Sequence, residues 1–153
     1  MTIGTHHREA FWEYVKGFIQ NDSFLSEHVE MIPGGCNHYC TIAIKSSELK
    51  NRLAPYKCQI IELSVASTRP LPCIWYIFNN EDNRNNLMDV ISNYYINNDI
   101  GGELQSIANE HGNDGGRVKF IIYRNREIRK IVANEARALY FLLKKSILAI
   151  LNS

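Results

Sequence analysis

Residues 33–40, PGGCNHYC, place glycine, cysteine and histidine closer together than anywhere else in the chain. A cysteine acts as a nucleophile when a base lies within hydrogen-bond reach and a third group orients that base. Cys36 is followed by His111 and then by Asn113 and Asp114, an order that one class of cysteine hydrolases uses. Two interpretations stay open, a cysteine-dependent hydrolase that uses Cys36 and His111, and a glycine turn that leads into a strand. We favour the turn.

Metal binding is the next chemistry that these residue types suggest. Cys36, His38 and Cys40 could join Cys58 and Cys73 around a tetrahedral zinc ion. Structural zinc sites usually offer their ligands as two close pairs, whereas Cys58 and Cys73 stand alone in apolar segments. A free cysteine in such a segment behaves as a small hydrophobic residue. We therefore expect no metal site and no cofactor.

Two other segments lack the pattern that phosphate or nuclease chemistry requires. Residues 111–118, HGNDGGRV, place their glycines before a strand, whereas a phosphate-binding loop places them between a strand and a helix. Residues 61–65, IELSV, come closest to the acidic motif of a nuclease, but Ser64 stands where that motif needs a lysine. We predict a turn and no phosphate-binding loop in the first segment, and no nuclease chemistry in the second.

The C-terminal third of the chain is basic. From residue 115 onward it carries nine of the 17 Lys and Arg residues but two of the 16 Asp and Glu residues, so eight basic and 14 acidic residues precede it. The formal net charge of +1 thus hides opposite charges in the two parts of the chain. Such a division indicates an anionic partner or self-complementary packing.

Residues 117–130, RVKFIIYRNREIRK, interleave basic and aromatic side chains, which can contact phosphates while a ring stacks on a base. An acidic protein partner fits the same charges, and a solvated strand edge and helix face would explain them without a partner. The predicted partner-binding residues are Arg117, Lys119, Tyr123, Arg124, Arg126, Arg129 and Lys130.

Hydrophobic periodicity predicts the elements that would position these residues. Helices are expected at residues 8–20, 23–31, 47–54 and 86–96, with a broken helix from residue 100. β-Branched and apolar runs predict strands at residues 39–45, 56–66, 73–78 and 117–124. Residues 125–133 either open a helix or form a hairpin strand before Asn134 caps a terminal helix that runs to about residue 152. We favour the hairpin strand.

These elements predict a single α+β domain over residues 1–153, in which helices pack on a mainly antiparallel sheet of about four to five strands. A chain of 153 residues, 45% of them hydrophobic, is long enough to bury its own core. The long terminal helix carries an apolar stripe at Ala136, Leu139, Leu143, Ile147 and Ile150, which further leucines widen. This stripe makes the helix a candidate homodimer face.

The N-terminal residues MTIGTHHREAFWEYV contain no apolar run of the kind that an export signal needs. Lys144 and Lys145 divide the longest apolar region, which is too short to span a bilayer. We expect a cytoplasmic protein with reduced cysteines and no membrane partner.

A further pattern is formed by Phe11 and Trp12 in the first helix, Asn86 after the asparagine-rich turn, and Gly102 and Leu104 ahead of the strand at 117–124. In this order of elements most of the chain resembles an uncharacterised domain that follows restriction-endonuclease-like nuclease domains in prokaryotic defence proteins. The resemblance implies an accessory module and carries over no catalytic residue. The leading hypothesis is a non-enzymatic binding or regulatory module in a prokaryotic or phage defence context, which contacts a protein or nucleic acid through its basic C-terminal third.

Overall fold

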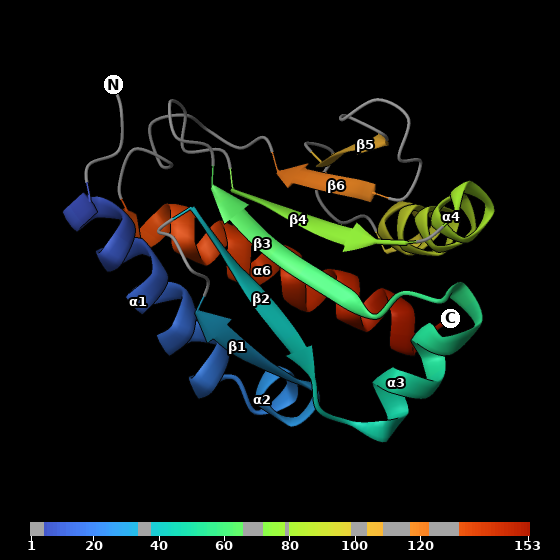
Figure 1. Ribbon diagram of the computed structural model, residues 1–153, viewed down its shortest axis with the longest axis horizontal. Coiled ribbons are helices and arrows are strands. Elements are labelled where there is room, and N and C mark those ends of the chain that lie inside the picture. The colour runs from blue at the N-terminus through green and yellow to red at the C-terminus, as the bar shows by residue number, and fades with distance from the viewer. Residues whose placement is uncertain are drawn as a thin grey trace.

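A computed structural model of the chain describes residues 5–33, 38–65, 72–78, 80–98, 104–108, 117–122 and 132–153 (Figure 1). The helices within these ranges are α1 (Thr5–Asn21), α2 (Ser23–His28), α3 (Ser47–Leu53), the 3₁₀-helix η1 (Ala54–Tyr56), α4 (Glu81–Asn97) and α6 (Val132–Leu151). The strands are β1 (Val29–Pro33), β2 (Tyr39–Ile44), β3 (Ile60–Val65), β4 (Pro72–Ile77), β5 (Leu104–Ala108) and β6 (Arg117–Ile122).

The described strands form one six-stranded sheet in the order β1-β2-β3-β4-β6-β5. Every neighbouring pair is antiparallel. The first four strands follow chain order, and β6 then inserts between β4 and β5. As a result, the basic strand β6 lies inside the sheet and is hydrogen-bonded on both sides.

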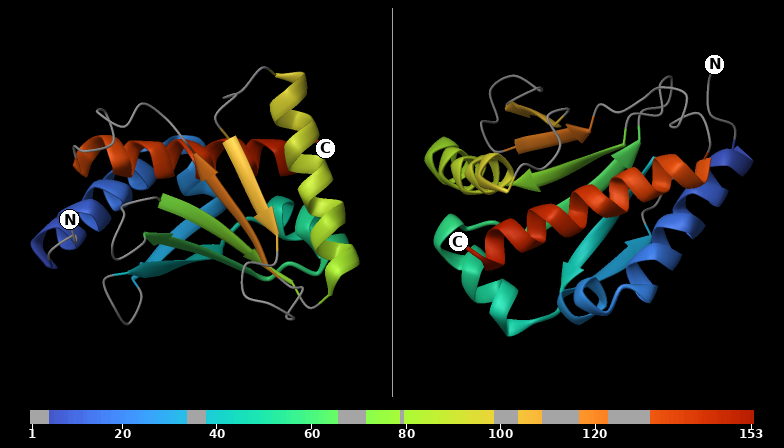
Figure 2. Two further views of the ribbon diagram at one scale, coloured as in Figure 1. Left: turned by 90° about the horizontal axis from the view of Figure 1, so that it is seen from above. Right: turned by 180° about the vertical axis from the view of Figure 1, so that it is seen from behind.

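The helices lie on one face of this sheet. Figure 1 looks onto the other face, with α6 behind the strands, and the right panel of Figure 2, seen from behind, shows α6 in front of them with α1 beside it. Burial along β3 follows this arrangement, because Ile61, Leu63 and Val65 are buried while Ile60 is exposed. This period of two is that of a strand with one face in the core.

Helix α6 is the centre of the core. It packs against α1, α3, α4, β4 and β6. The predicted apolar stripe is buried along its whole length, namely Ala136, Leu139, Leu143, Ile147 and Ile150. Other elements of the same chain therefore cover the stripe that predicted a homodimer. The stripe by itself gives no reason to expect a second copy of the chain.

The α+β class, the antiparallel sheet with helices packed on it and the long C-terminal helix are confirmed. The helix predicted at residues 23–31 is wrong beyond His28, because Val29–Pro33 pairs with β2. The broken helix predicted from residue 100 is wrong at Leu104–Ala108, which pairs with β6. In both places, pairing with the next strand along the chain outweighs a weak local preference for helix.

The start of the terminal helix also differs from the prediction. Helix α6 begins at Val132, so Asn134 lies within the helix and is not its N-cap. The choice between strand and helix for residues 125–131 falls outside the described residues. Helix α4 begins at Glu81, five residues before the predicted start at residue 86, and Asn80 is its N-cap. The predicted break between the first two helices is confirmed, since Asp22 separates α1 from α2.

Asp22 ties the N-terminal helices to α6. Its carboxylate caps α2 by accepting a hydrogen bond from the Leu25 amide at 2.9 Å, and it accepts two more from Tyr140 Oη at 2.5 Å and Lys144 Nζ at 2.8 Å. Burial by itself raises the pKa of Asp22, but the hydrogen bonds and the Lys144 charge outweigh it and lower the pKa to about 2. The ionised carboxylate therefore stabilises the folded state.

We predict that Asp22→Asn destabilises the protein by about 1–2 kcal/mol at neutral pH, because the amide still caps α2 but has no charge for Lys144. Since the folded-state pKa of Asp22 lies below its usual 3.8, its contribution is complete above about pH 4 and is lost as the pH falls towards 2. Urea unfolding of both proteins between pH 2 and 7 measures this.

The matched control is Glu27→Gln, which neutralises an exposed carboxylate on the neighbouring helix and should change stability little. If the free energies of unfolding of wild type and Asp22→Asn differ by the same amount at every pH down to 2, the Asp22 charge does not stabilise the fold.

Candidate partner-binding surface

The predicted partner-binding residues fall into two groups. Arg117 and Lys119 lie on β6, where their Cα atoms pair with those of Ile77 and Trp75 in β4. The rest of the predicted set lies outside the described residues: Tyr123, Arg124, Arg126, Arg129 and Lys130. The structure therefore holds the first two positions at fixed places in the sheet.

A row of paired residues crosses the sheet and includes Lys119. Ile32 pairs with Thr41, Thr41 with Glu62, Glu62 with Trp75, Trp75 with Lys119, and Lys119 with Ile107. In β1 to β4 this row belongs to the face opposite the helices, because Ile32 is exposed and the residues beside Glu62 are buried in the core. Trp75 is 7% exposed and donates a hydrogen bond from Nε1 to Ser64 Oγ at 2.7 Å. A partner on this face would meet Glu62 close to the basic strand.

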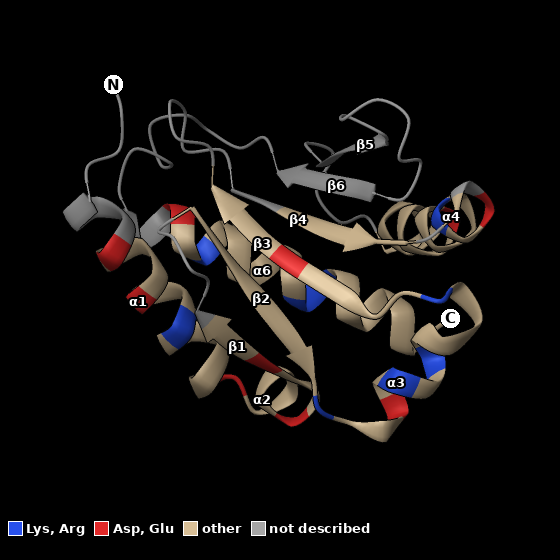
Figure 3. Cartoon of the chain, viewed as in Figure 1, with Lys and Arg blue, Asp and Glu red and all other residues tan. Residues whose placement is uncertain are grey.

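The other basic residues of the C-terminal third that the structure describes lie on α6. Arg137, Lys144 and Lys145 follow one another at helical spacing, and Figure 3 shows basic segments along α6 behind the sheet. Arg137 Cζ lies 5.0 Å from the centre of the Phe18 ring, and Lys145 Nζ lies 4.9 Å from that of Phe141. Both are cation–π distances.

Helix α1 adds aromatic rings to the same place. The Phe18 ring stacks with Tyr140 at a centroid distance of 5.5 Å and with Tyr14 at 6.4 Å. Tyr14, at the end of this column, is 48% exposed. We call this area the α1–α6 surface and define it by Tyr14, Phe18, Arg137, Tyr140, Phe141, Lys144 and Lys145.

The three- and four-residue spacing within residues 8–20 predicts one buried stripe that includes Tyr14 and Phe18 together with Phe11, Val15 and Ile19. The latter three are buried, but Tyr14 is exposed and Phe18 is half-buried. The sequence could have indicated this exposure, because Tyr14 lies about 100° around the helix from Val15 and therefore at the edge of the apolar stripe. An aromatic residue at the edge of such a stripe reaches the surface.

The cysteine chemistry considered from the sequence finds no support among the described thiols. Cys40 and Cys58 are free and buried, and burial raises the pKa of each to about 12, with the Glu62 charge adding to the effect at Cys40. Thiols of this kind are inert at neutral pH. Cys36 and His111 lie outside the described residues, so the pair stays a prediction.

Within the described residues, no three histidine, cysteine or acidic side chains come close enough to hold a metal ion. Cys40 sits on the helix-covered face of the sheet, paired with Leu63, and Cys58 precedes the start of β3. The two thiols therefore belong to the core.

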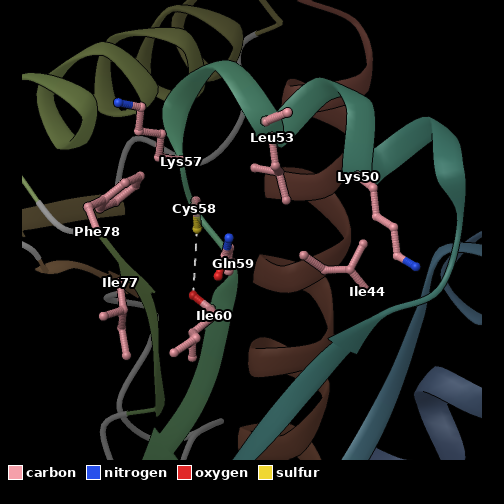
Figure 4. Close-up of a pocket in the computed structure, with 10 residues that line it drawn as sticks. Ile44, Lys50, Leu53, Lys57, Cys58, Gln59, Ile60, Ile77 and Phe78 are labelled. Carbon is pink, nitrogen blue, oxygen red and sulfur yellow. Dashed lines mark hydrogen bonds between the residues drawn. The ribbon is translucent and has the colours of Figure 1, made fainter.

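Cys58 also borders a cavity of about 730 Å³ between α3, η1 and the adjoining ends of β3 and β4 (Figure 4). Its thiol donates to the Ile60 carbonyl at 3.6 Å, and the side chains of Lys50 and Lys57 extend away from each other on opposite sides of it. The remaining lining residues are mostly apolar: Ile44, Leu53, Ala54, Gln59, Ile77 and Phe78. The described lining residues include neither histidine nor carboxylate, so none of them offers a base to the thiol.

No family model, curated protein or solved structure matches the chain. Within the described part of the chain, no helix combines the length and apolar character that crossing a membrane requires.

We predict that Cys40 and Cys58 of the folded protein stay unmodified by iodoacetamide at pH 7 while a cysteine in a short reference peptide reacts fully. A pKa of about 12 leaves roughly one thiol in 10⁵ ionised at this pH, and burial blocks access. Peptide mass spectrometry gives the rate for each cysteine separately.

The same measurement tests Cys36, which as a turn residue should react no faster than the reference peptide. A Cys36 rate about tenfold above that of the peptide, lost in His111→Ala, would instead establish an activated thiol and favour the hydrolase. Modification of Cys40 or Cys58 at the rate of the peptide would contradict their burial.

Proposed function

We propose that this protein is a non-enzymatic binding or regulatory module that contacts an anionic partner, a nucleic acid or an acidic protein, through its basic C-terminal third. The observation that carries the proposal is the gathering of nine basic residues against two acidic ones from residue 115 onward. Most other charged residues of the chain are acidic. A partner drawn by charge would therefore approach the C-terminal third.

Two structural features support this proposal. Strand β6 is held between β4 and β5, so Arg117 and Lys119 start from a rigid element. Helix α6 follows Lys130 by two residues and brings Arg137, Lys144 and Lys145 to its outer side. The inert thiols of Cys40 and Cys58 also agree with a module that binds its partner without catalysing a reaction.

The proposed context is prokaryotic or phage defence, on the strength of the resemblance to an accessory domain of nuclease-containing defence proteins. Phe11, one residue of that resemblance, is a core residue packed edge-on against Trp12. A cytoplasmic location belongs to the same proposal, and the free thiols agree with a reducing compartment. A homodimer through α6 would have to use Leu148 and Leu151, which are half-buried.

The test is a triple variant, Arg124→Ala, Arg126→Ala and Arg129→Ala, compared with wild type for binding to a 30-nucleotide single-stranded DNA and to poly-L-glutamate at 50 to 300 mM NaCl. We expect wild type to bind at least one of the two polymers in a salt-dependent way. We expect the variant to bind it about tenfold or more weakly at 50 mM NaCl, with a shallower salt dependence, because fewer counterions are released.

The matched control replaces Lys16, Lys45 and Lys50 by alanine, which removes the same charge from exposed positions outside the basic third. Its affinity should change by less than about twofold, because distant exposed charges are screened. If both variants lose the same affinity, or if wild type binds neither polymer, the proposed surface is wrong.

A further inference from the structure

Helix α6 leaves a single stripe outside the core between Glu135 and Ile150. The side chains of Arg137, Tyr140, Phe141, Lys144, Lys145 and Leu148 are exposed or half-buried, and every other side chain in this part of the helix is buried. Residues at these spacings share one face of a helix. The chain thus buries its aliphatic residues and presents cations and aromatic rings.

Cations and rings alternate across this stripe and onto α1. Arg137 lies over Phe18, which belongs to the stacked column with Tyr14 and Tyr140, and Lys145 lies over Phe141. The planes within the column are nearly parallel, at 23° and 27°. Tyr14 ends the column with about half of its area in solvent. A further flat ring can add to such a column.

The charge of the α1–α6 surface is positive. Asp22 is the carboxylate that touches it, and Lys144 neutralises that charge at 2.8 Å. The exposed acids of α1, Glu9 and Glu13, lie about 140° and 100° around the helix from Tyr14, on another side. The charges of Arg137 and Lys145 therefore meet no opposing carboxylate on α1 near the column.

We propose that the α1–α6 surface binds single-stranded nucleic acid, with an unpaired base stacking on the exposed ring of Tyr14 and phosphates contacting Arg137 and Lys145. This inference rests on the proposed function and names the class of its partner. Rings beside cations are the combination that sequence-tolerant single-strand binders use. A duplex keeps its bases stacked and offers no free ring face to Tyr14.

The dimensions agree with a short stretch of strand. From Arg137 to Lys145 the helix rises about 12 Å, the length of about three to four stacked nucleotides. One residue separates Lys130 from the start of α6, so the surface follows directly in sequence on the basic segment of the proposed function. An acidic peptide would use the same cations but gains less from the exposed ring of Tyr14, and it is the competing outcome of the test.

The experiment measures fluorescence anisotropy of labelled dT12, of a 12-base-pair duplex and of labelled poly-L-glutamate with the full chain at 50 mM NaCl. We expect wild type to bind dT12 at least fivefold more tightly than the duplex. The variant Tyr14→Leu should bind dT12 about tenfold more weakly, since a stacked base contributes substantially. The variant Arg137→Gln with Lys145→Gln should weaken binding and lower the slope of log K against log salt by about one.

The matched controls are Tyr56→Leu with Tyr94→Leu for the rings and Lys45→Gln with Lys50→Gln for the charges. All four residues lie on other parts of the surface, and these variants should bind dT12 as wild type does. Thermal unfolding of each variant shows whether it is folded at the assay temperature. If the ring variant proves unfolded, Arg137→Gln with Lys145→Gln, which removes no buried side chain, decides the question.

The outcomes separate this inference from the proposed function. Binding of poly-L-glutamate but not dT12 overturns the inference and leaves the proposed function standing with an acidic protein as partner. Loss of dT12 binding in the Arg124, Arg126 and Arg129 triple variant, with no effect of the α1–α6 variants, also overturns the inference alone. If wild type binds none of the three polymers, both proposals fail.

Discussion

The packing of α6 against the sheet is the constraint on which the remaining structure depends. Six antiparallel strands expose one face of apolar side chains, and α6 covers it with Leu139, Leu143, Ile147 and Ile150. Helices α1, α3 and α4 then pack around α6. Each buried aliphatic side chain of α6 stabilises the fold by about 1.5–3 kcal/mol relative to an exposed one, so this helix supplies a large part of the driving force.

Polar contacts fix how α6 is oriented in this packing. Ser146 is buried on the core side and donates to the Leu143 carbonyl at 3.0 Å, while the hydroxyl of the fully buried Tyr76 bonds to Ser146 Oγ. Asp22 holds the same helix from the other side through Tyr140 and Lys144. A rotation of α6 would leave buried polar groups without partners, which is costly in a core. The outward stripe of cations and rings is therefore determined by these contacts.

The elements with strong periodicity could be predicted from the sequence, and the short strands that form only by pairing with another strand could not. The alternation in β3 and the helical stripes of α1, α4 and α6 are properties of one segment at a time. Strand β1 continues directly from α2 and is a strand because β2 lies beside it. Strand β5 depends in the same way on β6. The residues of a five-residue segment do not by themselves show which strand it will pair with.

The candidate site shows the same division. The charge asymmetry identified the basic third, and the sequence placed Arg117 and Lys119 on a strand that the structure contains. It did not identify Tyr14 and Phe18, since their role depends on Arg137 and Tyr140, more than a hundred residues away. Composition can thus indicate a class of partner, whereas the arrangement of rings and cations needs the tertiary fold.

Helix α6 follows strands β1 to β4 in the chain, and this order affects how the chain acquires its structure during synthesis. On the ribosome, strands β1 to β4 emerge well before α6, the helix that covers their apolar face. Until α6 emerges, this apolar face is exposed. During that interval the nascent chain exposes a surface prone to wrong associations. Cooperative folding should therefore begin only after α6 has left the exit tunnel. Nascent chains that stall before that point should depend on chaperones.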